Sequence, residues 1–138
     1  MWFERADGVN YAPLMVRRPG KAPDGTPLRP RNIFQTEGFT DTYTPNPAIE
    51  AMAVAIGGDQ IQLPAQRAVP GLALRGRQVL AAPISNNAGG VTAVLGQYKS
   101  APGSDGHYVV FDIPAANHQS AAFLGTLART GTATVVAP

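Results

Sequence analysis

Residues 32–57 read NIFQTEGFTDTYTPNPAIEAMAVAIG, and this stretch contains the signals for a strand, a turn and a helix in that order. The run at 32–36 includes isoleucine, phenylalanine and threonine, which predicts a short extended strand. Glu37-Gly38 follows as a turn signal. We therefore expect the strand to stop there, with the glutamate side chain exposed.

Helix signals dominate the second half of the same stretch. Asn46 is a residue type that caps helices, Pro47 suits the first helical position, and Gly57-Gly58 is a typical helix terminator. Apolar residues recur between these signals at helical spacing. The pattern predicts one buried stripe, which comprises Ile49, Met52, Ala53 and Ile56.

The end of the chain resembles this unit, with an extended run followed by a helix. Residues 107–111 have the character of a strand or an extended loop, and Asp112 can cap a helix that ends at Gly131. An extended tail is expected over 132–136. Because strands alternate with helices, the sequence favours an α/β fold class over an all-β sandwich. The predicted buried face of the second helix comprises Ala116, Ser120, Phe123, Leu124 and Leu127.

The remaining segments have less regular patterns. Residues 59–104 alternate short apolar runs (72–74, 78–81 and 91–95) with Pro, Gly and Asn clusters, which predicts two or three short strands and a turn at Gly89-Gly90. Prolines interrupt residues 1–31, where only a short element around 9–16 is expected. We therefore predict a single, partial α/β domain over 1–138, with an irregular lead-in at 1–31 and a β-rich insertion at 59–104.

Composition excludes several kinds of partner. The net charge of the 138 residues is +2, and the cations that precede Glu37 are interleaved with Pro and Gly, which argues against a nucleic-acid interface. No apolar run reaches the length of a membrane span, and the absence of cysteine removes disulfides and thiolate chemistry. The spacing of His107, His118 and Asp112 matches no familiar metal site. We predict no nucleic acid, no membrane, no cofactor and no metal.

Asp41 and His107 are the candidate catalytic residues. Asp41 lies in the loop that leaves the predicted strand, and His107 lies in a Gly-His loop ahead of the last helix. In open α/β sheets, the loops beyond the carboxyl ends of the strands form the ligand site. A hydrolytic triad needs a carboxylate that orients an imidazole, whose other nitrogen takes a proton from the nucleophile.

These residues resemble the closing elements of the α/β-hydrolase family. Gly38, Asp41 and Pro45 match a G-x-x-D-x-x-x-P pattern of the acid loop, and Gly106-His107 matches the closing Gly-His loop. Acid before histidine is also the family's order. The resemblance implies a partial α/β-hydrolase-like sheet with two flanking helices. It also implies that Asp41 supports His107 as general base and then acid on a small ester or acyl substrate.

The nucleophile of such a triad is missing from the sequence. No G-x-S-x-G pattern occurs, and Ser104, the nearest imitation, lies three residues from His107 without a preceding strand. We therefore expect the C-terminal portion of a serine ester hydrolase, inactive alone and dependent on a nucleophile-bearing segment or chain. The strand at 32–36 would then have an open edge, which predicts self-association.

A second interpretation belongs to another class of protein. Low charge, many Gly and Pro residues and a proline-rich N-terminal arm also describe a β-rich assembly protein, such as a viral shell or decoration subunit without an active site. The distance between the Asp41 carboxylate and the His107 ring separates the two interpretations. Hydrogen-bond contact favours the hydrolase, whereas placement on opposite faces favours the assembly protein.

Overall fold

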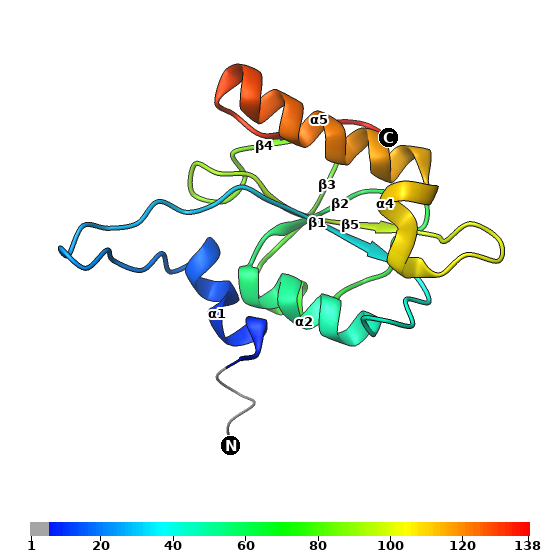
Figure 1. The fold of residues 1–138 in the computed structure, drawn as a ribbon, viewed down its shortest axis with the longest axis horizontal. Coiled ribbons are helices and arrows are strands. Elements are labelled where there is room, and N and C mark those ends of the chain that lie inside the picture. Colours follow the sequence, from blue (N-terminus) through cyan, green and yellow to red (C-terminus); the bar gives the residue numbers. More distant parts are fainter. Residues whose placement is uncertain (1–5) are drawn as a thin grey trace.

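The computed structural model describes residues 6–138, so residues 1–5 of the predicted lead-in lie outside the described part. A parallel sheet of four strands lies at the centre, with helices on both of its faces (Figure 1). The α/β fold class predicted from the sequence is confirmed. The strand order across the sheet is β1 (Ile33–Gly38), β5 (Ala93–Tyr98), β2 (Asp59–Ile61) and β3 (Val79–Leu80).

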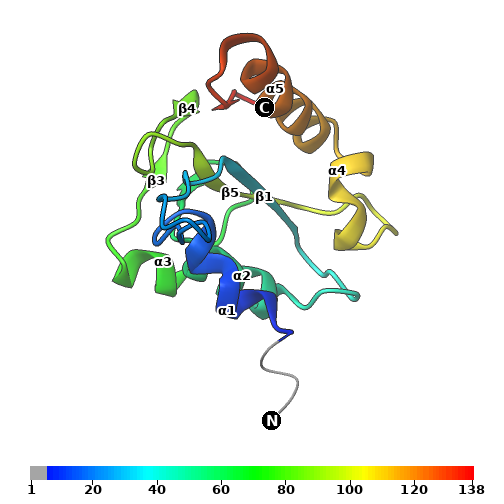
Figure 2. The same cartoon turned by 60° about the vertical axis from the view of Figure 1, so that its left-hand side comes forward.

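Helices cover the two faces of the sheet unequally (Figure 2). One face carries α1 (Gly8–Met15), α2 (Asn46–Ile56) and α3 (Pro70–Leu74), and the other carries α4 (Val109–Asp112) and α5 (Pro114–Thr130). A separate antiparallel pair joins β4 (Ile84–Ser85) to β6 (Thr134–Val135). The extended tail predicted at the end of the chain is therefore a short strand.

Residues 59–104 supply most of the strands. β2, β3 and β5 all come from this segment, and β5 lies between β1 and β2. The segment predicted as an insertion is thus built into the same sheet as β1. The run at 72–74, which the sequence predicts as a strand, belongs to helix α3, where Pro70 occupies the start of the helix. Ala88 and Val91 form an antiparallel bridge around Gly89-Gly90, which confirms the predicted turn.

Pairing of β1 with β5 positions the loops that follow them. The register runs from Ile33 opposite Ala93 to Gly38 opposite Tyr98, so the two parallel strands end side by side. The strand continues through Glu37 and Gly38, and the predicted stop at this dipeptide is wrong. Both carboxyl ends therefore open onto the same edge of the sheet, where α/β proteins form their sites.

Helix α2 follows the predicted bounds but begins differently. It ends with Gly57 in the left-handed conformation at φ 82°, which confirms the predicted terminator. Asn46 was expected to cap the helix, yet Pro45 occupies the cap position and makes no capping hydrogen bond from a side chain. The Asn46 amide instead donates to Glu37 Oε1 and to the Gly38 carbonyl, both at 2.8 Å.

The C-terminal unit differs from its prediction in three places. Residues 107–111 are helical, forming η2 (Gly106–Tyr108) and then α4, because the Asp105 side chain caps the turn through the backbone N–H of His107. Asp112 ends α4 and does not cap α5, whose cap position is Ile113. Leu124 is 65% exposed, so the buried face of α5 does not include it. Gly131 ends α5 as predicted.

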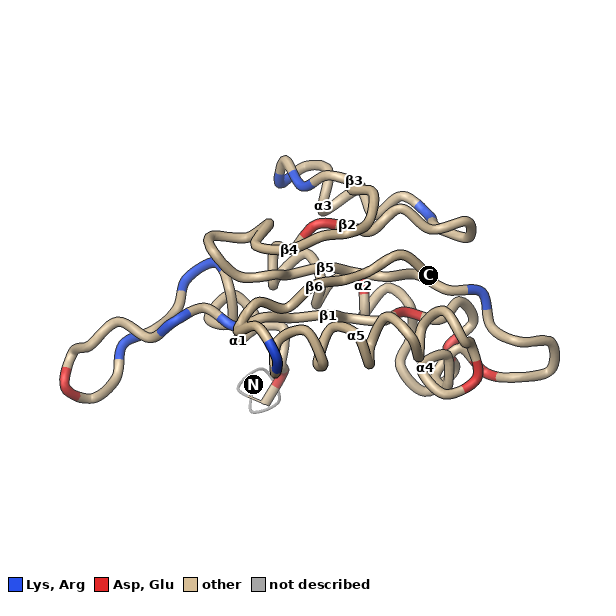
Figure 3. Tube along the Cα trace, turned by 90° about the horizontal axis from the view of Figure 1, so that it is seen from above, with Lys and Arg blue, Asp and Glu red and all other residues tan. Residues whose placement is uncertain are grey.

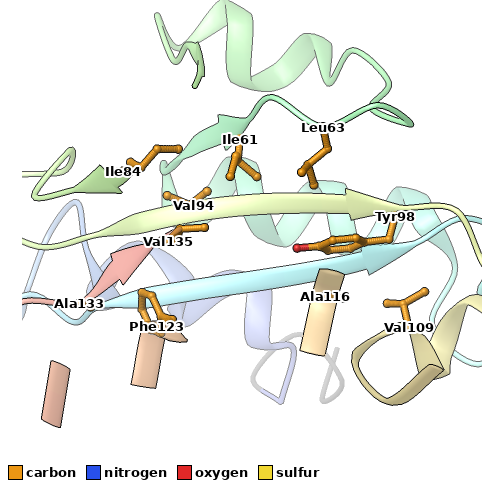
Figure 4. Packing of buried hydrophobic residues seen from close by; sticks show 10 residues of the cluster. All are labelled: Ile61, Leu63, Ile84, Val94, Tyr98, Val109, Ala116, Phe123, Ala133 and Val135. Carbon is orange, nitrogen blue, oxygen red and sulfur yellow. The ribbon is translucent and has the colours of Figure 1, made fainter. Parts of the chain in front are cut away.

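The main core lies between the sheet and α5 (Figure 4). Phe34 of β1 packs on Phe123 with ring centroids 5.8 Å apart. Tyr98 is buried, which raises its pKa, and its hydroxyl donates to Gln119 Oε1 at 2.6 Å. Gln119 in turn donates to the Val136 carbonyl at 2.6 Å, so a buried polar chain joins β5, α5 and the C-terminal tail.

The charged residues are unevenly distributed (Figure 3). Lys and Arg lie along the N-terminal arm that follows α1, whereas several acids gather near α4 at the other end of the molecule. A turn at Asp24, whose carboxylate accepts from the Thr26 N–H at 2.9 Å, folds the arm back. Among residues 6–138, no helix combines the length and apolarity needed to cross a bilayer.

Among residues 6–138 no strand pairs with the outer edge of β1, and this open edge is expected to cause self-association. The Ile33 N–H donates to Thr92 and the Phe39 N–H to Tyr98, so the alternating N–H groups of Phe34 and Thr36 face away from β5. Thr36→Pro removes one outward donor, and we expect it to lower the mass measured by light scattering after size exclusion. Thr36→Val, which keeps the donor, should leave the mass unchanged. A monomeric wild-type protein at every concentration would contradict the prediction.

Candidate acid–histidine site

Two glycines bring the loop after β1 against the turn that follows β5. A Cβ atom on Gly38 would lie 2.1 Å from the Gly106 carbonyl oxygen, and one on Gly106 would lie 2.5 Å from the Phe39 oxygen. Both distances are far shorter than any real Cβ contact. Only residues without a side chain therefore allow the two segments to approach this closely.

This approach brings Asp41 and His107 together. Asp41 Oδ2 lies 3.2 Å from His107 Nδ1, although the residues are 66 positions apart in the chain. The Asp41 side chain is 5% exposed, and its Oδ1 accepts from the backbone N–H groups of Tyr43 at 2.9 Å and Thr44 at 2.7 Å. The His107 side chain is 42% exposed. A buried, anchored carboxylate thus faces one nitrogen of a solvent-accessible imidazole.

Asp105 ties the two loops to each other. Its carboxylate accepts from the Thr42 N–H and hydroxyl and from the His107 N–H, the last at 2.9 Å. Hydrogen bonds from the Thr42 hydroxyl and then from the His107 backbone lower the pKa of Asp105. The sequence predicts Asp105 only as a turn residue. Its contact with the acid loop depends on the tertiary structure.

Glu37, the other acid near the predicted strand end, lies elsewhere. The prediction that it is turn-exposed is wrong, because β1 continues past it and the strand alternation directs it into the protein, where it is fully buried. Its carboxylate accepts from Gln97 Nε2 and Asn46 Nδ2, both at 2.8 Å, and lies 3.4 Å from Arg67 Nη2. Its partners are thus Gln97, Asn46 and Arg67, not His107.

The buried Glu37 network reaches a neighbouring helix and loop. Burial and then the charge of Glu37 raise the pKa of Glu50 on α2. The Arg67 guanidinium lies 4.2 Å above the ring of Phe39, the first residue of the acid loop. The network therefore supports the start of the loop that holds Asp41. The sequence contains no local signal for it, since its members lie in separate segments.

No serine hydroxyl within residues 6–138 hydrogen-bonds to the His107 ring. Ser104 donates to Asp112, and Ser100 donates to the Phe39 carbonyl at 2.5 Å. His118 is exposed on α5, as the sequence predicts. The same described part of the chain has no group of three or more His, Cys, Asp or Glu residues arranged to hold a metal ion.

A pocket of about 490 Å³ opens beside the pair. Asp41, His107 and Thr44 lie on its wall together with apolar residues of three helices. Thr36 and Gly38 also line it, so the pocket borders β1. Such a mixture of an apolar wall and a few convergent polar groups is typical of small-molecule sites. The main apolar contributors are Val9, Ile49, Met52 and Val109.

Searches against protein-family models, curated proteins and solved structures found no match to this chain. The function is therefore argued from the site alone.

Proposed function

We propose that Asp41 and His107 form the acid–base pair of a serine-type ester hydrolase, of which this chain is the C-terminal portion. The observation that supports the proposal is the 3.2 Å contact between Asp41 Oδ2 and His107 Nδ1. The contact joins a buried carboxylate to a half-exposed imidazole at the wall of a pocket. A carboxylate that orients a histidine is the shared element of hydrolytic triads on unrelated folds.

In this proposal each group has a separate role. With Nδ1 protonated and donating to Asp41, Nε2 of His107 is the nitrogen that takes the proton of an attacking hydroxyl. The hydroxyl oxygen then bonds to the acyl carbon, the bond from that carbon to the alkoxy oxygen breaks, and Nε2 returns the proton to the departing alcohol. A water molecule, whose proton Nε2 takes, then attacks the acyl group, and the nucleophile recovers that proton as the carboxylate product leaves. Two backbone N–H groups and the ring N–H stabilise the anionic Asp41 carboxylate, which in turn stabilises the imidazolium.

The hydroxyl nucleophile must come from outside residues 6–138. The pocket borders β1, whose outer edge is unpaired within the described part of the chain, and a nucleophile-bearing segment that docks there would lie near His107. Without that segment, the oxyanion donors and the nucleophile are both missing, and most of the rate enhancement is lost. The proposed partner is therefore a nucleophile-bearing chain, and the proposed substrate is a small ester or acyl compound.

The assembly-protein interpretation has less support. Such a subunit needs neither a helix-covered parallel sheet nor a carboxylate that contacts a histidine, and both are present here. The assembly interpretation nevertheless predicts a clear result in the experiment that follows, because a histidine without a catalytic role should not influence ester cleavage.

The pure chain is expected to cleave the activated ester p-nitrophenyl acetate only slowly, through His107. His107→Ala should remove this cleavage, and Asp41→Asn should lower it several-fold because the ring loses its orienting acceptor. A downfield proton resonance of His107 Nδ1–H should also disappear in Asp41→Asn. Rates are followed by absorbance and the proton by NMR.

His118→Ala is the matched control for this experiment. The chain has two histidines, and His118 lies exposed on α5 without an acid partner in the described structure. Its removal should leave the rate unchanged. Robust turnover that survives both Asp41→Ala and His107→Ala would overturn the assignment of the pair.

A further inference from the structure

Two tyrosine rings meet at the histidine of the pair. Tyr43 lies 4.9 Å from the His107 ring centroid, Tyr108 lies 5.3 Å from it, and the two tyrosine rings are 5.9 Å apart. The interplanar angles of 40°, 88° and 75° are tilted or edge-to-face. These are favourable geometries for aromatic contacts.

The aromatic cluster is exposed instead of buried. Tyr43 is 66% exposed and Tyr108 is 41% exposed, although tyrosine usually buries most of its ring. Phe111, which is 78% exposed, lies three residues after Tyr108 in the continuous helical stretch 106–112 and therefore on the same helical face. An exposed group of large rings beside a polar site is typical of a ligand-binding surface.

The acidic residues around the aromatic cluster determine which charge an aromatic ligand can carry. Asp41 and Asp105 flank His107, and Asp112 lies one residue after Phe111. The pKa of Tyr108 is raised, and the main cause is its side-chain hydrogen bond with Tyr43. The negative charges of Asp105 and Asp112 raise this pKa further. A negative surrounding disfavours an anionic aromatic acid at the rings relative to its neutral ester.

We infer that Tyr43 and Tyr108 bind an aromatic ring of the substrate, so the site takes neutral esters of aromatic carboxylic acids. The ester part of this inference rests on the proposed function, whereas the preference for a ring rests only on the exposed cluster. The rings contact His107, which lines the pocket beside Asp41. A ring stacked there would place an adjoining ester group next to His107. After cleavage, the aryl carboxylate would be repelled by the same acids and would leave.

Titration of the full chain with matched probes tests the inference. We expect methyl benzoate to shift the ring NMR signals of Tyr43 and Tyr108 and to bind about two- to tenfold more tightly than methyl cyclohexanecarboxylate. Sodium benzoate should bind more weakly than the methyl ester. Tyr43→Leu or Tyr108→Leu should weaken the binding of methyl benzoate by about two- to tenfold. Tyr43→Phe, which keeps the ring, should retain the preference.

Tyr11→Leu is the control, because Tyr11 is an exposed tyrosine on α1 that belongs to a different element from the cluster. It should leave methyl benzoate binding unchanged. Equal binding of the cyclohexyl ester, or no shift at Tyr43 and Tyr108, overturns the aryl preference. If methyl benzoate binds as expected while His107→Ala leaves ester cleavage intact, the proposed function fails and the ring site stands.

Discussion

Gly106→Ala is expected to separate His107 from Asp41 and to destabilise the protein by about 1–3 kcal/mol. The added Cβ would lie 2.5 Å from the Phe39 oxygen, 2.6 Å from the Gly38 oxygen and 2.8 Å from the Asp41 nitrogen. All three are backbone atoms, so no flexible side chain can move aside. The loop that contains Asp41 must move instead, and the contact at Nδ1 is lost.

Two measurements check this result. The His107 Nδ1–H resonance should disappear as it does in Asp41→Asn, and cleavage of p-nitrophenyl acetate should fall toward the rate of His107→Ala. Urea unfolding gives the loss of stability. Gly38→Ala should have the same effect from the other side of the contact, where its Cβ would lie 2.4 Å from Val109 Cγ1.

Gly125→Ala is the matched control. Gly125 lies within α5, and its added Cβ would meet only the end of the flexible Arg129 side chain, at 3.0 Å from Nη1. Alanine also has the higher helix propensity, so this variant should be neutral or slightly more stable. An intact Nδ1–H signal and wild-type stability in Gly106→Ala would show that the two glycines do not determine the approach of the loops.

Gln97→Leu is expected to reduce the free energy of unfolding by about 3 kcal/mol. Gln97 is buried in β5, and its Nε2 donates at 2.8 Å to the fully buried Glu37 carboxylate. Its Oε1 accepts from Gln60 Nε2 at 2.8 Å and from the Arg67 backbone at 2.7 Å. Leucine would leave the buried Glu37 carboxylate, the buried Gln60 amide and the part-buried Arg67 backbone N–H with fewer partners.

A second substitution tests whether Gln97→Leu destabilises the protein through the Glu37 carboxylate or only through altered packing. Glu37→Gln removes the charge that Gln97 stabilises, so the double variant should be more stable than the sum of the two single changes predicts, by roughly 1 kcal/mol. Gln62→Leu serves as control, because Gln62 is exposed and its change should stay within about 0.5 kcal/mol of zero. Additive effects in denaturant unfolding would show that Glu37 and Gln97 are not coupled.

Several elements could be predicted because their signals are local. Gly57 and Gly131 end their helices in the left-handed conformation, as short-range rules for C-terminal caps require. Asp112 shows the limit of such rules. Aspartate is a residue type that suits the first position before a helix, but here the chain is already helical before Asp112, which ends α4. The preference of one side chain does not decide whether that residue ends one helix or caps the next.

The candidate pair was predicted from the order of an acid loop and a Gly-His loop, and the structure brings its two members into contact. The sequence predicts a turn at Glu37 because Glu-Gly is a common turn pair. In the structure it is buried, and its partner Gln97 lies 60 residues away, aligned by the pairing of β1 with β5. Sequence spacing contains no information about such a partner.

The sequence by itself determined the α/β class, the C-terminal ends of the two main helices and the choice of Asp41 and His107 as the candidate pair. These features follow from the preferences of neighbouring residues, which act over a few positions. Only the tertiary structure decided that β5 lies beside β1, that Glu37 is buried and that Gly38 meets Gly106. Each of these depends on packing between segments far apart in the chain, where the free energy of burial outweighs local preference.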